Sequence, residues 1–473
     1  MPKARNPETV KTILALAVLV WLVLGSCLVL DRPLVRGDGL AHFMWLDSMA
    51  RDWDLDLTNQ AAKFAQVNTY QVFLNSKTGR YASVFPFGSA LLWVPWYWLS
   101  TAADHLPLLH VNDAYFVQHQ GVTLAFSFFP MLGTNLYALA AVVLAYLAAR
   151  RLASHKAALV TALTLFWGTP LWYYATVEPF SSHVAGTLAV SLLLYLCVRW
   201  RVPSQPAPPG HPERSEGPHA WWLWLLAGLA AGLAALVRWQ LALYALPLGA
   251  VLLWKRERRL LASFCVGFVA LAWLVPYSWW RMFGSPWVIP AAEQNRSAFL
   301  VWPTHLGQVL FSSEKGLFVW APLTALALLG LVVLYRKQRD LSLGLAAMFV
   351  LQALINASVY DWWAGWGFGM RRMAEAYPVF VIGLAALLSS RLPAGWWRRL
   401  YHSALALAVT AATAYAGLLL FSHLNYINTV LDRPQGSTAA SEICYQVRES
   451  SWHITWLVMK DHYGPWAWRK PGP

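Results

Sequence analysis

The sequence predicts an all-α, polytopic membrane protein with about 11 transmembrane helices. Of its 473 residues, 58% are hydrophobic and only 12% are charged, a balance that soluble globular domains do not show. Uncharged stretches recur along the chain, and about 20 apolar residues suffice to cross the hydrocarbon core of a bilayer. The composition therefore excludes a soluble globular enzyme.

The first uncharged stretch, residues 12–30, follows Lys3, Arg5 and Lys11. Its segment Leu24-Gly25-Ser26-Cys27 is similar to a lipoprotein cleavage site, but the apolar run continues past Cys27, so we expect a retained first span. The eleven predicted spans are residues 12–30, 121–149, 157–177, 179–198, 220–237, 241–254, 260–280, 316–335, 341–360, 376–390 and 403–422.

Residues 84–103 form a further apolar stretch that we place in the membrane interface. Counting it as a crossing would move Arg150, Arg151 and Lys156 to the outer side and invert every later loop. Its prolines and clustered aromatic residues fit a juxtamembrane or re-entrant helix at the level of the lipid headgroups. The sequence therefore predicts juxtamembrane helices within a long first outer loop.

The distribution of charge supports this topology. The chain carries 36 Lys and Arg against 22 acidic residues, a net charge of +14. With the N-terminus in the cytoplasm, the inner segments hold 19 of the basic and 5 of the acidic residues, and the outer segments hold 17 of each. An excess of Lys and Arg on the cytoplasmic side is what the positive-inside rule expects. The basic balance thus reflects orientation, and no nucleic-acid partner is expected.

The domain organisation follows from the spans. We expect an N-terminal membrane module (residues 1–201, with the first outer loop at 31–120), a C-terminal membrane region (220–422) and a short outer tail (423–473). Between the two membrane parts, residues 202–219 contain six prolines and no apolar periodicity, which is typical of a disordered cytoplasmic linker. The four cysteines are scattered and predict neither a disulfide framework nor a metal site.

The polar residues that could take part in binding or catalysis fall in the outer loops. Asp38 lies eight residues after the first span, at or just before a helix with apolar residues near helical spacing; an ordinary N-cap would also place an aspartate there. Glu178 and His183 lie between two closely spaced spans. Ionisable groups at membrane depth are costly unless they face a polar cavity, so both are candidate site residues, although Glu178 could also lie in the headgroup region.

Later outer segments add cations and aromatic residues. Arg238 and Gln240 separate two apolar runs, where either snorkelling or anion binding would suit an arginine. Lys315 lies at the membrane edge, and the segment from Asp361 to Arg371-Arg372 joins an acid, three tryptophans, three glycines and two arginines. Guanidinium groups bind phosphate bidentately and aromatic faces bind sugar rings. An interfacial aromatic belt would explain the tryptophans alone.

Together these segments resemble the GT-C superfamily of integral-membrane glycosyltransferases, which includes protein O-mannosyltransferases and lipid A aminoarabinose transferases. The resemblance rests on an acid shortly after the first span (Asp38), Phe85-Pro86 opening a juxtamembrane helix, Glu178-Pro179 in the next outer loop and Arg238 at the outer end of a helix rich in small residues. Their order and shared side of the membrane carry the similarity, which extends from the first helix to about Arg372.

The resemblance implies a hexosyl- or pentosyltransferase that moves a sugar from a polyprenyl phosphate to a lipid, glycan or protein acceptor, with inversion. Asp38 would be the general base, and Glu178 would be a second catalytic residue. Substrate binding would fall to His183, Arg238, Gln240, Lys315, Asp361, Arg371 and Arg372. No ligand set demands a metal, although Asp38 and Glu178 could share a divalent ion.

The expected location is the bacterial cytoplasmic membrane, with the protein in contact with membrane lipids and its site on the outer face. A transporter or flippase of lipids or lipid-linked sugars is the alternative reading of the same outer residues. Transporters typically carry ionisable groups near the midplane and show inverted repeats, whereas the predicted spans here are nearly uncharged at their centres and show no repeat.

Overall fold

The structure is a computed structural model that describes residues 7–31, 33–68, 70–110, 113–201, 221–293, 302–365, 367–390 and 396–430. It is mostly helical, with one short antiparallel hairpin whose register pairs Val72 with Ser83. The predicted linker at 202–219 and nearly all of the predicted tail at 423–473 lie outside the described residues.

The helices and strands follow one another in this order: α1 (Pro7–Leu30), α2 (Asp38–Asp47), η1 (Ser48–Asp52), α3 (Thr58–Lys63), β1 (Val72–Asn75), β2 (Arg80–Ser83), α4 (Gly88–Ala103), η2 (Pro107–Leu109), α5 (Asp113–Gln120), α6 (Leu124–Ala149), α7 (His155–Trp167), α8 (Leu171–Thr176), α9 (His183–Arg201), α10 (Trp221–Val237), η3 (Trp239–Tyr244), α11 (Ala245–Trp254), α12 (Arg258–Ala272), α13 (Leu274–Phe283), α14 (Pro290–Glu293), α15 (Leu306–Phe311), α16 (Leu317–Trp320), α17 (Leu323–Tyr335), α18 (Arg339–Ala357), η4 (Arg371–Ala376), α19 (Tyr377–Leu388) and α20 (Trp396–Val430).

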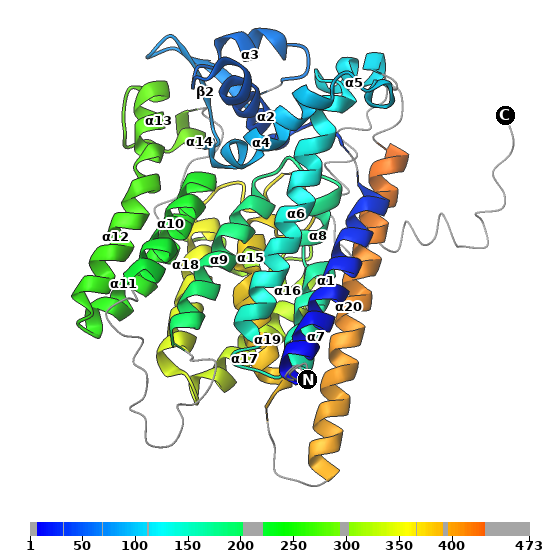
Figure 1. The fold of residues 1–473 in the computed structure, drawn as a ribbon, viewed down its shortest axis with the longest axis vertical. Coiled ribbons are helices and arrows are strands. Elements are labelled where there is room, and N and C mark those ends of the chain that lie inside the picture. Colours follow the sequence, from blue (N-terminus) through cyan, green and yellow to red (C-terminus); the bar gives the residue numbers. More distant parts are fainter. Residues whose placement is uncertain are drawn as a thin grey trace, which may run out of the picture.

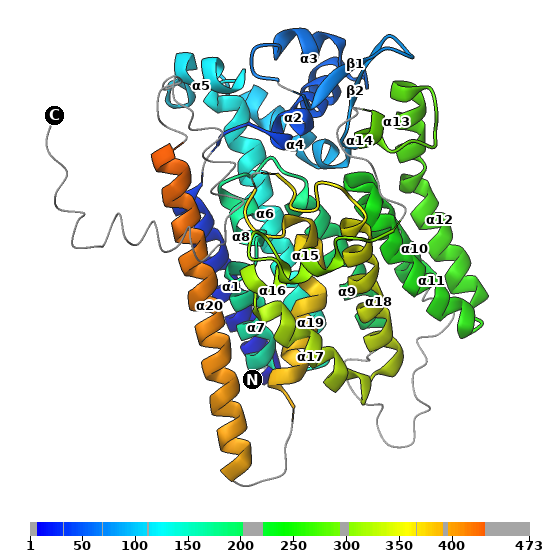
Figure 2. The ribbon, with the colours of Figure 1, turned by 180° about the vertical axis from the view of Figure 1, so that it is seen from behind.

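The molecule consists of a helical bundle and a cap at one of its ends. Figure 1 shows α2, α3, α4 and the hairpin at the upper end, above the long helices, while the N-terminus of α1 lies at the lower end. The view from behind in Figure 2 shows the same arrangement, with α1 and α20 side by side along one flank. The first outer loop predicted from the sequence therefore forms the cap.

Six described helical segments are long and apolar enough to cross a membrane, judged by length and composition. They are Pro7–Val29, Leu124–Ala149, His183–Trp200, Arg258–Phe283, Arg339–Ala357 and Arg399–Leu420. This chain is thus an integral membrane protein with several apolar helices. Shorter apolar helices occupy other predicted spans, and the total of eleven stays a prediction.

Two predicted spans are broken rather than continuous. The stretch 157–177 divides into α7 and α8 around Pro170, and the stretch 316–335 divides into α16 and α17 around Pro322. Proline lacks the amide hydrogen of a continuous helix and clashes with the preceding turn, so a helix ends or restarts there. The polar segment that follows α8 is thereby turned toward the cap.

Close packing of α10 on α12 fixes the position of Arg238, which follows α10. A Cβ atom added at Gly228 would lie 2.1 Å from the carbonyl oxygen of Phe264, and one at Gly267 would lie 2.2 Å from that of Leu225. The two backbones are therefore in direct contact. Such close approach through small residues is the usual way in which membrane helices associate.

A cluster of buried hydrophobic side chains attaches the cap to the bundle. It joins Phe43 of α2 and Trp93 of α4 to Phe180, which follows α8, and Leu236 in α10. A Cβ atom added at Gly39 would lie 2.8 Å from the Cβ of Phe180, so α2 lies against the 178–182 segment. The first turn of α2 is consequently held next to Glu178 and Arg238.

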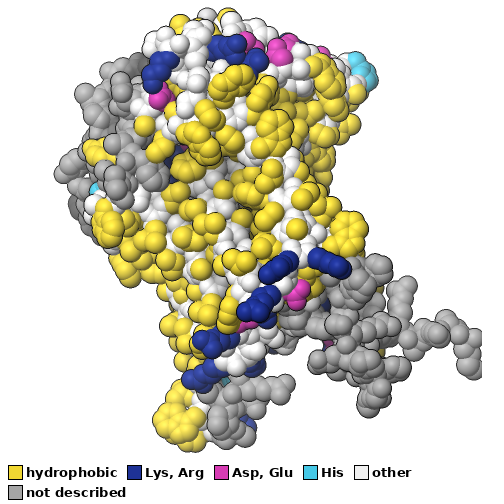
Figure 3. Space-filling view, turned by 90° about the vertical axis from the view of Figure 1, so that its left-hand side faces the viewer, with side chains coloured by type: hydrophobic (Ala, Val, Ile, Leu, Met, Phe, Trp, Pro, Cys, Tyr) yellow, Lys and Arg dark blue, Asp and Glu magenta, His cyan; other side chains and the backbone are white. Residues whose placement is uncertain are grey.

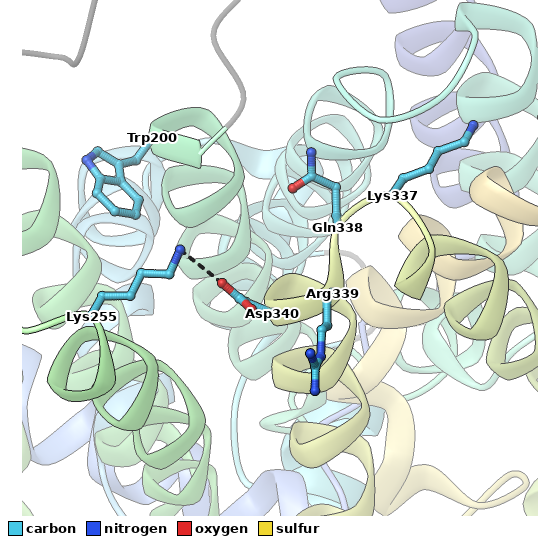
Figure 4. A pocket seen from close by; sticks show the side chains of 6 residues that line it. All are labelled: Trp200, Lys255, Lys337, Gln338, Arg339 and Asp340. Carbon is cyan, nitrogen blue, oxygen red and sulfur yellow. Dashed lines mark ion pairs between the residues drawn. The ribbon is translucent and has the colours of Figure 1, made fainter.

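Charged side chains are distributed differently at the two ends. Figure 3 shows Lys and Arg gathered over the lower part of the visible face with a few acidic side chains among them, and basic and acidic side chains together at the upper end. An open pocket of about 310 Å³ at the lower end is lined by Trp200, Lys255, Lys337, Gln338, Arg339 and Asp340. As Figure 4 shows, Lys255 reaches Asp340 across this pocket, at 2.9 Å. The pocket lies at the end of the bundle away from Asp38.

Candidate active site

An ion pair between the first and last parts of the predicted site forms its centre. Arg371 Nη2 lies 2.7 Å from Asp38 Oδ2, and the two side chains are 15% and 19% exposed. Asp38 is the first residue of α2 and follows Gly37, whose positive φ of 56° turns the chain into the helix. The N-cap of α2 is therefore Gly37 and not Asp38, and the Asp38 side chain contacts an arginine from η4.

Two carboxyl groups share this centre with opposite electrostatics. Burial is the largest single influence on Asp38 and favours its neutral form, but the charge and hydrogen bond of Arg371, together with the nearby His42 and His183, outweigh it and lower the pKa of the Asp38 carboxyl. Burial dominates at Glu178 and raises its pKa, with Arg371 acting in the opposite direction. The hydroxyl of Tyr173 donates to Glu178 Oε1 at 3.2 Å. The site thus contains a readily ionised acid beside one that resists ionisation.

A buried carboxylate that we did not predict from the sequence organises His183 and Arg238. Glu375 is fully buried at the end of η4. Its Oε1 lies 2.9 Å from His183 Nδ1 and 3.2 Å from Arg238 Nε. The only sequence signal for Glu375 is its position, one residue before a predicted span. It brings two predicted binding residues together from different helices.

Further polar groups complete this network. Gln352 of α18 donates from Nε2 to Glu375 Oε2 at 3.1 Å and accepts a hydrogen bond from the hydroxyl of Tyr244. Arg238 donates from Nη1 to the Ser182 hydroxyl at 3.0 Å. With its amide oxygen turned toward Arg238, Gln240 accepts from Nη2 at 2.9 Å. Arg238 is therefore fixed in one orientation.

The two adjacent arginines have different partners and do not form a single clamp. Arg371 pairs with Asp38, whereas Arg372 Nη2 lies 2.9 Å from Asp361 Oδ2. Arg372 is also held by the Asp361 backbone, whose carbonyl accepts from Nη1 at 3.0 Å. The pair Asp361–Arg372 thus stabilises the glycine-rich segment, while Arg371 alone reaches the acid of α2.

Lys315 reaches the same region from the loop between α15 and α16. Its side chain is buried and its ammonium donates to the carbonyl oxygen of Gly365. Burial, followed by the Arg371 charge, lowers the pKa of Lys315 to about 7, while Glu314 and Glu178 act in the opposite direction. An amine in this range changes charge near neutral pH.

His42 is a second residue that we did not predict. It lies one turn after Asp38 on α2, is 1% exposed, and its ring centre is 4.9 Å from that of Phe85. The apolar spacing of this helix in the sequence gave no reason to separate His42 from a core residue.

No group of three or more His, Cys, Asp and Glu side chains within the described ranges is placed to hold a metal ion. The acid that could have shared an ion with Glu178 is instead engaged by Arg371, at 2.7 Å. A divalent ion between Asp38 and Glu178 stays a prediction.

Solved structures show what this fold is similar to. ArnT from Cupriavidus metallidurans in the apo state aligns with a TM-score of 0.51 and 14% identity, over 97% of this chain and 76% of that one. ArnT bound to undecaprenyl phosphate gives a TM-score of 0.47, 15% identity and coverages of 97% and 78%. The Archaeoglobus fulgidus oligosaccharyltransferase AglB, in complex with an inhibitory peptide and a dolichol-phosphate, aligns with a TM-score of 0.49 and 12% identity. The alignment covers 94% of this chain and 60% of that one.

The fold resembles that of GT-C membrane glycosyltransferases. The structural similarity extends over nearly the full chain and confirms the resemblance expected from the sequence. No protein-family model and no curated protein matches the sequence itself. At this level of identity the similarity concerns the fold, and the activity has to be argued from the residues.

Proposed function

We propose that this protein transfers a sugar from a polyprenyl-phosphate donor to an acceptor hydroxyl at the non-cytoplasmic face of the membrane, with inversion. The observation that supports this most is the Asp38–Arg371 pair, 2.7 Å apart at the junction of cap and bundle. It joins a carboxylate able to take a proton to a cation able to hold a phosphate. The proposal includes the eleven spans, with the N-terminus in the cytoplasm of a bacterial cell.

The reaction is a single displacement. The acceptor oxygen bonds to the anomeric carbon while the bond from that carbon to the phosphate oxygen breaks, and the electron pair leaves with the phosphate. Asp38 takes the acceptor proton. A general base must lie within hydrogen-bond reach of that hydroxyl, and the lowered pKa of Asp38 keeps it ionised at neutral pH. Attack opposite the leaving group inverts the anomeric centre.

Arg371 links donor binding to the strength of the base. In the free protein it neutralises Asp38. A donor phosphate competes for the same guanidinium, because arginine binds phosphate and carboxylate through the same donors. When Arg371 turns to the phosphate, the burial of Asp38 is no longer compensated and its pKa rises. The base thus becomes stronger when the donor is in place.

The remaining residues have supporting roles in the proposal. Lys315 adds positive charge for the leaving phosphate, and Glu178 orients the acceptor close to Asp38. Arg238, held by Glu375 at 3.2 Å, and its neighbours His183 and Gln240 form the wall of the binding site. Asp361 and Arg372 hold the aromatic segment beside the donor.

The proposal is tested with the full chain in membrane vesicles of both orientations. Radiolabelled undecaprenyl-phosphate hexoses and pentoses are supplied, with membrane lipids, glycans or peptides as acceptors, with and without a chelator. We expect transfer only where the cap faces the added donor. Passage of the labelled lipid across the bilayer without transfer would support a transporter, and absence of both would overturn the proposal. Loss of transfer with the chelator would support the divalent ion.

A further inference from the structure

His42 places a hydrogen-bonding group in the site that the protein itself does not satisfy. Its side chain is 1% exposed, and among the described residues nothing partners its Nδ1 atom. Buried polar atoms are nearly always paired, because an unpaired one loses its hydrogen bonds to water without replacement. An unpaired buried nitrogen beside a reactive centre therefore needs an explanation.

The surroundings of His42 indicate where its missing partner lies. Asp38 and His42 are four residues apart on α2 and so share one face of the helix. On one side the imidazole contacts aromatic rings, with ring centres 4.9 Å away at Phe85 and 6.4 Å away at Trp93. Aromatic rings offer Nδ1 no conventional partner, whereas the Asp38–Arg371 pair marks the polar side of the same helix face.

The protonation state of His42 limits the kind of partner. Burial lowers the pKa of its imidazole to about 3, and the Arg238 and Arg371 charges add to this effect against that of Asp38. The ring is therefore neutral at physiological pH and has one donor and one acceptor nitrogen. A neutral ring is a poor partner for a phosphate, which prefers cations, but it suits a hydroxyl group, which both donates and accepts.

We propose that Nδ1 of His42 binds a hydroxyl group of the sugar being transferred and thereby selects the donor by its hydroxyl pattern. This inference rests on the proposed glycosyltransferase function and assigns part of its specificity. In the proposed reaction Arg371 turns from Asp38 to the donor phosphate, and the sugar then lies beside Asp38. A sugar hydroxyl would thus come within one helical turn of Asp38, where His42 lies. The rings of Phe85 and Trp93 hold the imidazole in place behind it.

The test pairs substitutions with matched donors. His42→Phe keeps an aromatic ring without nitrogen, and His42→Asn retains polar atoms at the position of Nδ1. Each is compared with the unmodified full chain on the undecaprenyl-phosphate sugar that the latter uses, and on its single-deoxy analogues. We expect one deoxy analogue to lower kcat/KM roughly 10- to 100-fold in the unmodified protein. That loss should vanish in His42→Phe and persist in His42→Asn.

Controls separate this role from packing. Phe43→Leu disturbs the same helix without touching Nδ1, so it should leave the discrimination between donor and deoxy donor unchanged. Where His42→Phe does not fold, His42→Gln, whose amide reaches past the Nδ1 position, replaces it and should lose the discrimination.

The outcomes are distinguishable. Equal discrimination in the unmodified protein and in the variant lacking Nδ1 would overturn the inference and leave the proposed function intact. So would an unmodified protein that accepts every deoxy donor equally, or a variant whose altered discrimination concerns the acceptor instead. Absence of transfer by the unmodified protein from all donors would overturn the proposed function and this inference with it.

Discussion

The two ends of the bundle carry charge in different ways. At the cap end, Asp38 and Arg371 are 19% and 15% exposed, and His183 and Glu375 are 2% and 0% exposed. At the other end, the Lys255–Asp340 pair is 41% and 19% exposed, and Lys11 and Glu8 in α1 are 60% and 57% exposed. An exposed pair, Lys77–Glu293, also lies at the cap end, so burial distinguishes the candidate site from the other ion pairs rather than one whole end from the other.

This difference in burial distinguishes the residues that we propose for the reaction from those that indicate the orientation of the chain in the membrane. Removing charges from water is expensive and is sustained only by close, well-oriented partners, so the buried network at the cap end is costly to maintain without a function. Exposed charges cost little and contribute little. The Lys and Arg side chains at the lower end remain hydrated, as the proposed orientation requires, and the Lys255–Asp340 pair spans the pocket there.

The largest effect on stability is expected when Glu375 is removed. In Glu375→Ala, Arg238 and His183 stay buried without their carboxylate, and breaking a buried pair in this way costs about 3–5 kcal/mol. We expect the midpoint temperature of thermal unfolding, measured in detergent, to fall sharply. The control is Glu293→Ala, which removes the ion pair with Lys77, whose side chains are 24% (Glu293) and 65% (Lys77) exposed. Its unfolding temperature should stay close to that of the unmodified chain.

The next largest effect concerns Arg371. In Arg371→Gln the donor phosphate loses its cation and kcat should fall about 100- to 1,000-fold at neutral pH. The pKa of Asp38 should also rise, since burial then acts without the opposing charge. Because the base works only when ionised, the acid limb of the pH profile of kcat/KM, which reports ionisations of the free protein, should move to higher pH than in the unmodified protein. An acid limb that does not move would contradict the proposed coupling.

Lys315 should make donor binding depend on pH. Its pKa of about 7 is set by burial and by Arg371, with Glu178 and Glu314 opposing and Arg372 adding to the lowering. Lys315 loses its charge as pH rises through this value, so KM for the donor should be constant below pH 7 and increase about tenfold per unit above it. Lys315→Arg should remove this dependence. A pH-independent KM in the unmodified protein would argue against phosphate binding by Lys315.

The smallest effect is expected at the other end. Lys255→Gln breaks the pair with Asp340 at 2.9 Å, but a partly exposed pair contributes about 0–1 kcal/mol. Thermal stability and transfer activity should both stay near those of the unmodified chain. A severe loss of activity here would mean that burial does not separate the candidate site from the other ion pairs as described.

Much of this organisation could be predicted because membrane helices and their flanking charges are local in sequence. Asp38, Glu178 and Arg238 each follow an apolar helix at the same end, so their order along the chain already implied a common face. The network around Glu375 could not be predicted, because its partners come from α9, α18 and the end of α10. The divergence of Arg371 and Arg372 depends on the backbone of the glycine-rich segment, which charge patterns do not describe.

The most direct test of the central claim is the transfer rate of Asp38→Asn in vesicles supplied with undecaprenyl-phosphate sugars. Asparagine keeps the shape of the side chain but cannot take the acceptor proton, so kcat should fall roughly 100- to 10,000-fold. Asp52→Asn, in η1 just beyond the same helix, should transfer at close to the unmodified rate. Transfer by Asp38→Asn at the rate of the unmodified protein would contradict the account.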